Sequence, residues 1–208
     1  MDERARALER AEGDDDAARL LRERLRAGTL SEARLEVAAA LGHPPAAAAL
    51  GTPPGPAAPA TLLVTLGALG WRGLLSLAEA LLCLHPEPLI DEAAQAGATI
   101  RARLRGEATG DLTELFVAAM VPTLQGRGST EVLSVLMAAA ILDAERAGGP
   151  QREALEGYLA AREESGDPPQ GAIESAAGML LPVVESAWPD LAPPLRDHLL
   201  PWLLSSQP

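Results

Sequence analysis

The chain has 208 residues, 48% of them hydrophobic and only 2% aromatic. This length suffices for one sizeable core or for two small domains that share an interface, and a core poor in aromatic residues favours packed helices over sheets. The formal net charge of -12 argues against a nucleic-acid-binding protein and against an anionic membrane surface as a partner, because both require a basic footprint.

Short helices separated by glycines are expected over the first fifty residues. A charged helix over residues 2–12 comes first, and each of the next three has a start signal: an acidic triplet, a serine or a histidine followed by prolines. Glycine just past the end of each helix is the usual stop signal. The starts are Asp14–Asp16, Ser31 and His43, and the stops are Gly13, Gly28, Gly42 and Gly51.

The run DDDAARLLRERLRAGTLSEARLEVAAALGHPPAAAALG, residues 14–51, orders these signals in a recognisable way. An acidic cap is followed by an Arg/Leu helix ending in RAG, a leucine helix, and an LGHP turn before AAxAL; WRGLLSLAEALLC comes later. In this order, residues 14–84 resemble a helical module of uncharacterised bacterial proteins from GC-rich genomes. The resemblance implies a helical-repeat fold and carries no activity.

Residues 51–59, GTPPGPAAP, form the best candidate boundary, because four prolines and two glycines make a stiff, irregular connector. The expected organisation is an N-terminal helical hairpin module at 1–50, a linker at 51–59 and a helical domain at 60–208.

The stretch from Thr61 to Leu84 is the most hydrophobic of the chain, with only two charges in it. Its glycines predict two short helices, and the second should be largely buried with one polar edge at the surface. A membrane span is not expected, since each charge at mid-bilayer would cost about 2.5–3.5 kcal/mol. The polar edge consists of Arg72, Ser76, Glu79 and Cys83.

Two further helices follow the turn at Pro86 and Pro88. The first should bury the stripe through Ile90, Ala93, Gly97, Ile100 and Leu104, and leave Arg101, Arg103 and Arg105 outside. The second should begin at an Asp111 cap, end or kink at Pro122, and bury Leu112, Leu115, Phe116, Ala119 and Met120.

The remaining helices complete an all-α chain of about ten short helices, because no segment alternates with period two. Ser129 to Ala147 predicts a helix with Asp143, Glu145 and Arg146 toward solvent. One helix after Pro150 should bury Ala154, Leu155, Tyr158 and Leu159, and two more are expected over 172–187 and from Pro194. The architecture is an α-solenoid or an irregular helical bundle.

No pattern of residues predicts a catalytic set, a cofactor or a metal. Cys83 and His85 form C-x-H, but zinc would need two further ligands from distant positions. A thiol in a leucine-rich helix would be poorly ionised and hence a weak nucleophile. The triplet Asp14–Asp16 lacks a spaced calcium loop, and helix capping explains it with fewer assumptions.

The working hypothesis is a non-enzymatic protein that interacts with another protein or helps an assembly to form. Trp71, Trp188 and Trp202 are its candidate contact residues, since Trp is enriched at binding hot spots; filling gaps in an Ala/Leu core is their alternative role. A single cysteine and an N-terminus without an apolar signal core indicate a cytoplasmic protein.

Two alternatives stay open. One is a helical enzyme or small-ligand binder with a dispersed polar site, for which Arg72, Glu79 and His85 are the candidates. The other is an acidic protein that neutralises a basic toxin or effector, which would require a contiguous acidic face.

Overall fold

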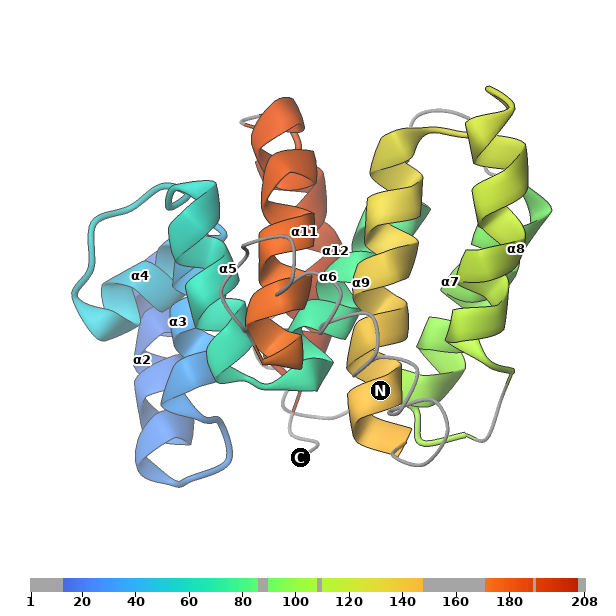
Figure 1. Ribbon diagram of the computed structural model, residues 1–208. Helices are drawn as coiled ribbons and strands as arrows, with labels where there is room; N and C mark the ends of the chain where they lie inside the picture. Colours follow the sequence, from blue (N-terminus) through green and yellow to red (C-terminus); the bar gives the residue numbers. More distant parts are fainter. Residues whose placement is uncertain (1–12, 86–89, 108–109, 148–170, 189, 206–208) are drawn as a thin grey trace. The chain divides into compact units, whose positions relative to one another are not determined.

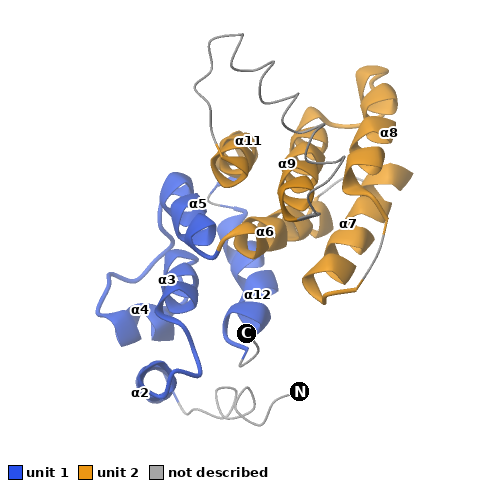
Figure 2. Ribbon diagram, turned by 60° about the horizontal axis from the view of Figure 1, so that its bottom comes forward, with its two compact units in different colours: residues 1–69, 187–208 blue, residues 70–186 orange. Residues whose placement is uncertain are grey.

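The computed structural model describes residues 13–85, 90–107, 110–147, 171–188 and 190–205. Within these ranges the chain is all-α, with ten helices and no strand (Figure 1). The expected fold class is therefore confirmed. Contacts group the chain into two compact units, residues 1–69 with 187–208 and residues 70–186, which Figure 2 colours separately.

The first unit is built from helices that pack in pairs: α2 against α4, α4 and α5 against α3, and α12 against α3. Its core consists of leucine and alanine side chains such as Leu21, Leu35 and Leu195. The helix bounds are α2 Asp14–Arg26, α3 Glu32–Ala40, α4 Pro44–Leu50, α5 Pro59–Ala68 and α12 Ala192–Leu203.

Local signals in the sequence set most of these helix ends. The Ser31 hydroxyl accepts a hydrogen bond from the Arg34 N–H and caps α3, as predicted. Gly42 ends α3 with φ of 79°, and a Cβ there would lie 2.9 Å from the Pro56 nitrogen, so only glycine fits. The start of α2 differs from the prediction, which placed the N-cap in the acidic triplet. Gly13 is the N-cap, and Asp14–Asp16 lie in the first turn of the helix.

The proline-rich connector lies within the first unit, between α4 and α5. Pro56 forms an isolated antiparallel bridge with Leu41, and the Ala57 N–H donates to the Ala40 carbonyl at 2.8 Å. These bonds hold the connector against the end of α3. The division into domains at 1–50 and 60–208 stays a prediction.

The second unit is an irregular bundle in which α9 packs against α6, α7 and α8. In a solenoid each element would contact only its neighbours along the chain, whereas α9 here returns to α6. Ile141 and Ala144 of α9 also pack with Ala172 of α11. The bounds are α6 Trp71–Cys83, α7 Asp91–Leu104, α8 Leu112–Leu124, α9 Thr130–Ala147 and α11 Ala172–Ala187.

Helix α6 is the central buried helix that the sequence predicted. Gly70, with φ of 71°, separates it from α5, and every residue from Gly73 to Leu82 is buried. Among the described residues, no helix combines the length and apolar character needed to cross a membrane.

Two expected helices, residues 2–12 and the one after Pro150 with Ala154, Leu155, Tyr158 and Leu159, lie outside the described residues.

Candidate functional site

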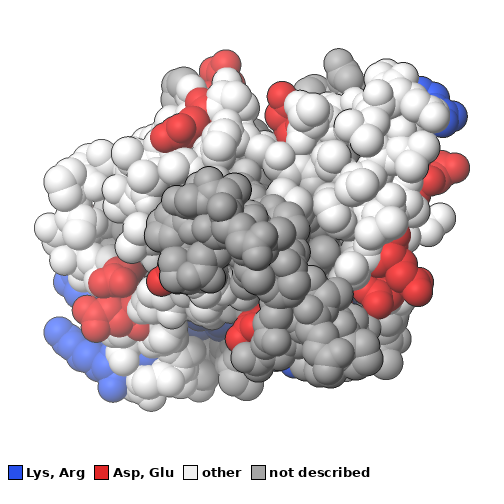
Figure 3. Space-filling model, in the orientation of Figure 1, with Lys and Arg blue, Asp and Glu red and all other residues white. Residues whose placement is uncertain are grey.

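Helix α8 carries a row of exposed apolar side chains, here called the outer face of α8. Its members are 54%, 36%, 56% and 78% exposed, and they follow the i, i+3, i+4, i+7 spacing of one helix face. Figure 3 shows largely uncharged surface over this helix, with charged atoms at its margin. The outer face consists of Val117, Met120, Val121 and Leu124.

The opposite side of α8 holds the helix on α7 and α9. Leu112, Ala119 and Thr123 are buried, and the Thr123 hydroxyl donates to the Ala119 carbonyl at 2.8 Å. The predicted inward position of Met120 is wrong: α8 is apolar on nearly all sides, so its sequence gives no polar stripe from which to tell inside from outside. Pro122 lies inside α8 and does not end it, because the helix continues to Leu124.

Charged residues flank the outer face at both ends. Glu114 is exposed in the first turn of α8, and Arg127 is exposed just beyond its last turn. There Gly126, with φ of 75°, closes the helix: its N–H donates to Thr123 O and the Arg127 N–H to Pro122 O, which is a Schellman motif. The face thus has an acidic and a basic end.

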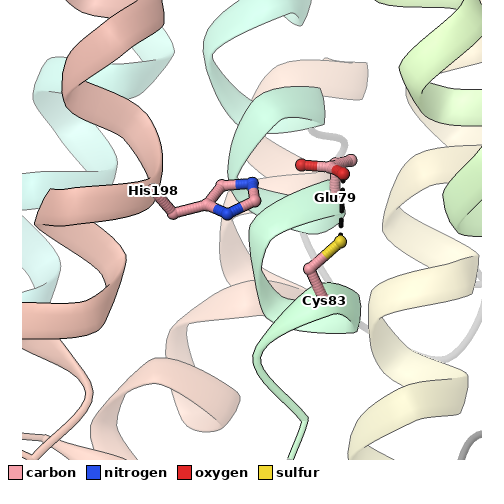
Figure 4. A group of neighbouring side chains, drawn as sticks. All are labelled: Glu79, Cys83 and His198. Atoms are coloured by element: carbon pink, nitrogen blue, oxygen red, sulfur yellow. Dashed lines mark hydrogen bonds between the residues drawn. The ribbon is translucent and has the colours of Figure 1, made fainter.

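A polar cluster joins α6 to α7 in the same unit. Glu79 is 6% exposed, and its carboxylate accepts hydrogen bonds at Oε1 from Arg101 Nη1 at 2.8 Å and from Cys83 Sγ at 3.1 Å. Figure 4 shows Glu79 and Cys83 on successive turns of α6; His198, also labelled, is an exposed residue of α12 in the first unit. The predicted polar edge of α6 is therefore only half exposed, because Ser76 and Glu79 are buried.

The Cys83 thiol in this cluster is a weak nucleophile. Partial burial of the thiol, its hydrogen bond to Glu79 and the charge of that carboxylate all raise the pKa of Cys83, and Arg101 only partly opposes them. A raised pKa keeps sulfur protonated at neutral pH, whereas catalytic cysteines need the thiolate. The cluster thus has the chemistry of an ion pair that joins two helices.

A second polar cluster surrounds Asp143 on α9. Asp143 is 5% exposed, and its carboxylate lies between two guanidinium groups: Arg103 Nη2 donates to Oδ2 at 3.2 Å, and Arg146 Nη2 donates to Oδ1 at 2.9 Å. The predicted solvent position of Asp143 is wrong, as is that of Arg103, because α7 and α9 pack side by side and the two side chains neutralise each other between them.

The three tryptophans are all half-buried. Trp71 lies under Arg72 and Arg146, whose guanidinium carbons are 5.5 and 5.6 Å from the ring centre. Such contacts are cation–π interactions within the molecule.

In the first unit, Trp202 lies under Arg34, 5.2 Å from the ring centre. The Arg34 side chain also donates to the Ser205 carbonyl at 3.3 Å, which ties α3 to the end of α12. Trp188 lies in the turn between α11 and α12. Trp71 and Trp202 thus have packing partners of their own.

The three candidate ligand residues, Arg72, Glu79 and His85, each contact a different element of the second unit. Arg72 is exposed beside Trp71, Glu79 is paired with Arg101, and His85 Nε2 lies 3.5 Å from the Ser129 hydroxyl. These contacts lead to α6, α7 and the start of α9 respectively.

Comparison with known proteins gives no match: no family model fits the chain, and no curated protein or solved structure is significantly similar to it. The candidate site therefore rests on geometry alone.

The outer face of α8 was not predicted from the sequence. Its residues follow the 3.6-residue helical spacing on the side opposite Leu112 and Ala119. This spacing identifies the face only once those two residues are known to be buried.

Proposed function

We propose that the chain is a non-enzymatic, cytoplasmic helical protein that interacts with another protein or helps an assembly to form, and that the outer face of α8 is its contact surface. The exposure of Val117, Met120, Val121 and Leu124 in one row carries this proposal. Covering such side chains with a partner gains about 25 cal/mol per Å² of apolar area. The face is rimmed by charge at both ends, as interaction sites commonly are.

The state of the buried polar groups supports a binding protein over an enzyme. Glu79 and Asp143 are each neutralised by arginine at hydrogen-bond distance, and the pKa of the Cys83 thiol is raised rather than lowered. The dispersed ligand site of Arg72, Glu79 and His85 is the alternative, and their contacts on separate elements favour it less.

The chemistry of the outer face also bears on the class of partner. The net charge of -12 argues against nucleic acid, and an uncharged row of Val, Met and Leu suits an apolar protein surface. Neutralising a basic toxin would instead use an acidic face, which this row is not. The resemblance of residues 14–84 to helical-repeat modules is in keeping with a protein that binds other proteins.

An affinity pull-down with a matched control tests the proposal. Val121→Glu places a carboxylate in the middle of the outer face, whereas Val64→Glu makes the same change at an exposed valine of α5, 74% exposed, in the other unit. We expect tagged wild-type chain and Val64→Glu to retain the same partner from the cells that produce the protein, and Val121→Glu to lose at least about nine tenths of it, because a charge buried at an interface is strongly unfavourable.

Circular dichroism should give the same helix content for all three proteins, because both valines are exposed. Equal recovery of the partner by the wild type and both variants would contradict the proposal, and so would the absence of a partner from all three.

A further inference from the structure

We infer that the partner on the outer face of α8 is a second copy of this chain, bound with the two α8 helices antiparallel about a two-fold axis. This inference rests on the proposed function, since it names the partner of the same surface. Two observations support it: the order of apolar residues along the face and the charges at its two ends.

The apolar residues are arranged symmetrically about a point between Met120 and Val121. A two-fold axis there places Met120 of one copy opposite Val121 of the other, and Val117 opposite Leu124. Every exposed apolar residue of the face therefore meets an apolar residue of the second copy. A two-fold interface requires this kind of self-complementarity, because the same patch serves both partners.

The charges obey the same symmetry. Glu114 precedes the axis by about as many residues as Arg127 follows it. Glu114, which is in α8, therefore lies about 10 Å along the helix from the axis at 1.5 Å per residue, and Arg127 lies just beyond the last turn at the other end. Both residues are exposed. Antiparallel pairing brings Glu114 of each copy beside Arg127 of the other, whereas parallel pairing would place like charges together.

The net charge of the chain and the small area of one helix face limit the affinity of the dimer. A net charge of -12 on each copy opposes association at long range, but at about 0.15 M salt this repulsion is screened beyond roughly 8 Å. One helix face is at the small end of specific interfaces, below about 1,200 Å² in total. We therefore expect a dissociation constant on the order of 1–100 μM.

Sedimentation equilibrium on the purified full-length chain tests this inference at about 0.15 M salt. The wild type should pass from the monomer mass of 21.6 kDa to twice that mass as its concentration rises through the micromolar range. Val121→Glu should weaken self-association at least about a hundredfold, because two carboxylates would meet near the axis. Val64→Glu, which changes an exposed valine of α5, should dimerise like the wild type.

Charge reversal tests the antiparallel register. Glu114→Arg alone should weaken the dimer about fivefold, since it opposes arginine to arginine at both ends. Adding Arg127→Glu should restore the dissociation constant of the wild-type dimer, because opposite charges then face each other again at both ends of the interface. Thermal melting at a monomeric concentration should be the same for these variants within a few degrees, which separates loss of association from loss of folding.

The failure of the dimer and the failure of the proposed contact surface give different experimental results. A monomer throughout the micromolar range, or a dimer unaffected by Val121→Glu, would overturn the inference, whereas a different protein lost from the Val121→Glu pull-down would still support the proposed function. A dimer disrupted by Val121→Glu but not restored by the double charge reversal would overturn the antiparallel arrangement.

Discussion

Asp143 shows how a single residue can reverse a prediction based on helix periodicity. The pattern of α9 predicted one buried stripe with Asp143 outside it, but α9 packs against α6, α7 and α8. A helix with neighbours on several sides buries several stripes, and its polar residues then need partners. Arg103 and Arg146 supply them, and neither contact follows from the local sequence.

We expect Asp143→Asn to lower the free energy of unfolding by about 2–4 kcal/mol, because it leaves the partly buried Arg103 without its counter-charge. The side chain keeps its shape, so the effect is electrostatic. Urea unfolding followed by circular dichroism measures it.

Glu145→Gln is the matched control for this change, two residues further along α9 and exposed. It should alter the same free energy by no more than about 0.5 kcal/mol. Equal effects of the two substitutions would show that the ion pairs around Asp143 contribute nothing particular to stability.

Among the elements, helix positions were more predictable than helix faces. Ser31 and Asp111 cap α3 and α8 as expected, because capping depends on a few neighbouring residues. Gly70 likewise separates α5 from α6. The outward row of α8 was missed because Met120 and its neighbours are as apolar as the buried side, so only the packing partners decide which side is covered.

We expect the start of α4 to respond to pH through His43, which caps this helix. Its Nδ1 accepts a hydrogen bond from the Ala46 N–H at 3.3 Å, which requires the neutral ring. Burial, and next the charge of Arg196, lower the pKa of His43, while Asp14 opposes them. The unfolded chain, with an ordinary pKa near 6.5, therefore takes up the proton first.

We expect the contribution of this cap, about 1 kcal/mol, to be present above pH of about 6.5 and to be lost as the pH falls through the lowered pKa of folded His43. In His43→Asn an amide oxygen caps the helix without titrating. Urea unfolding at several pH values between about 5 and 7.5 should thus show a steeper loss of stability for the wild type than for the variant. Parallel pH profiles would contradict this role of the ring.

At the scale of the whole molecule, the fold class followed from composition, but the pairing of helices did not. Alanine and leucine faces are chemically interchangeable, so nothing local indicates that α9 returns to α6 or that α12 packs on α3. The outer face of α8 could not be predicted from the sequence for the same reason. Trp71 and Trp202, which their rarity made candidate contact residues, lie half-buried under arginines of their own units, and a role in binding stays a prediction.

We propose that the outer face of α8 touches another protein chain in the cell, and site-specific photocrosslinking can detect this contact. A photoreactive benzoylphenylalanine would replace Val121 in one strain and Val64, the exposed valine of α5, in another. Irradiation of living cells should give a discrete crosslinked band from position 121 and none from position 64. No band from position 121, or the same bands from both positions, would contradict the claim.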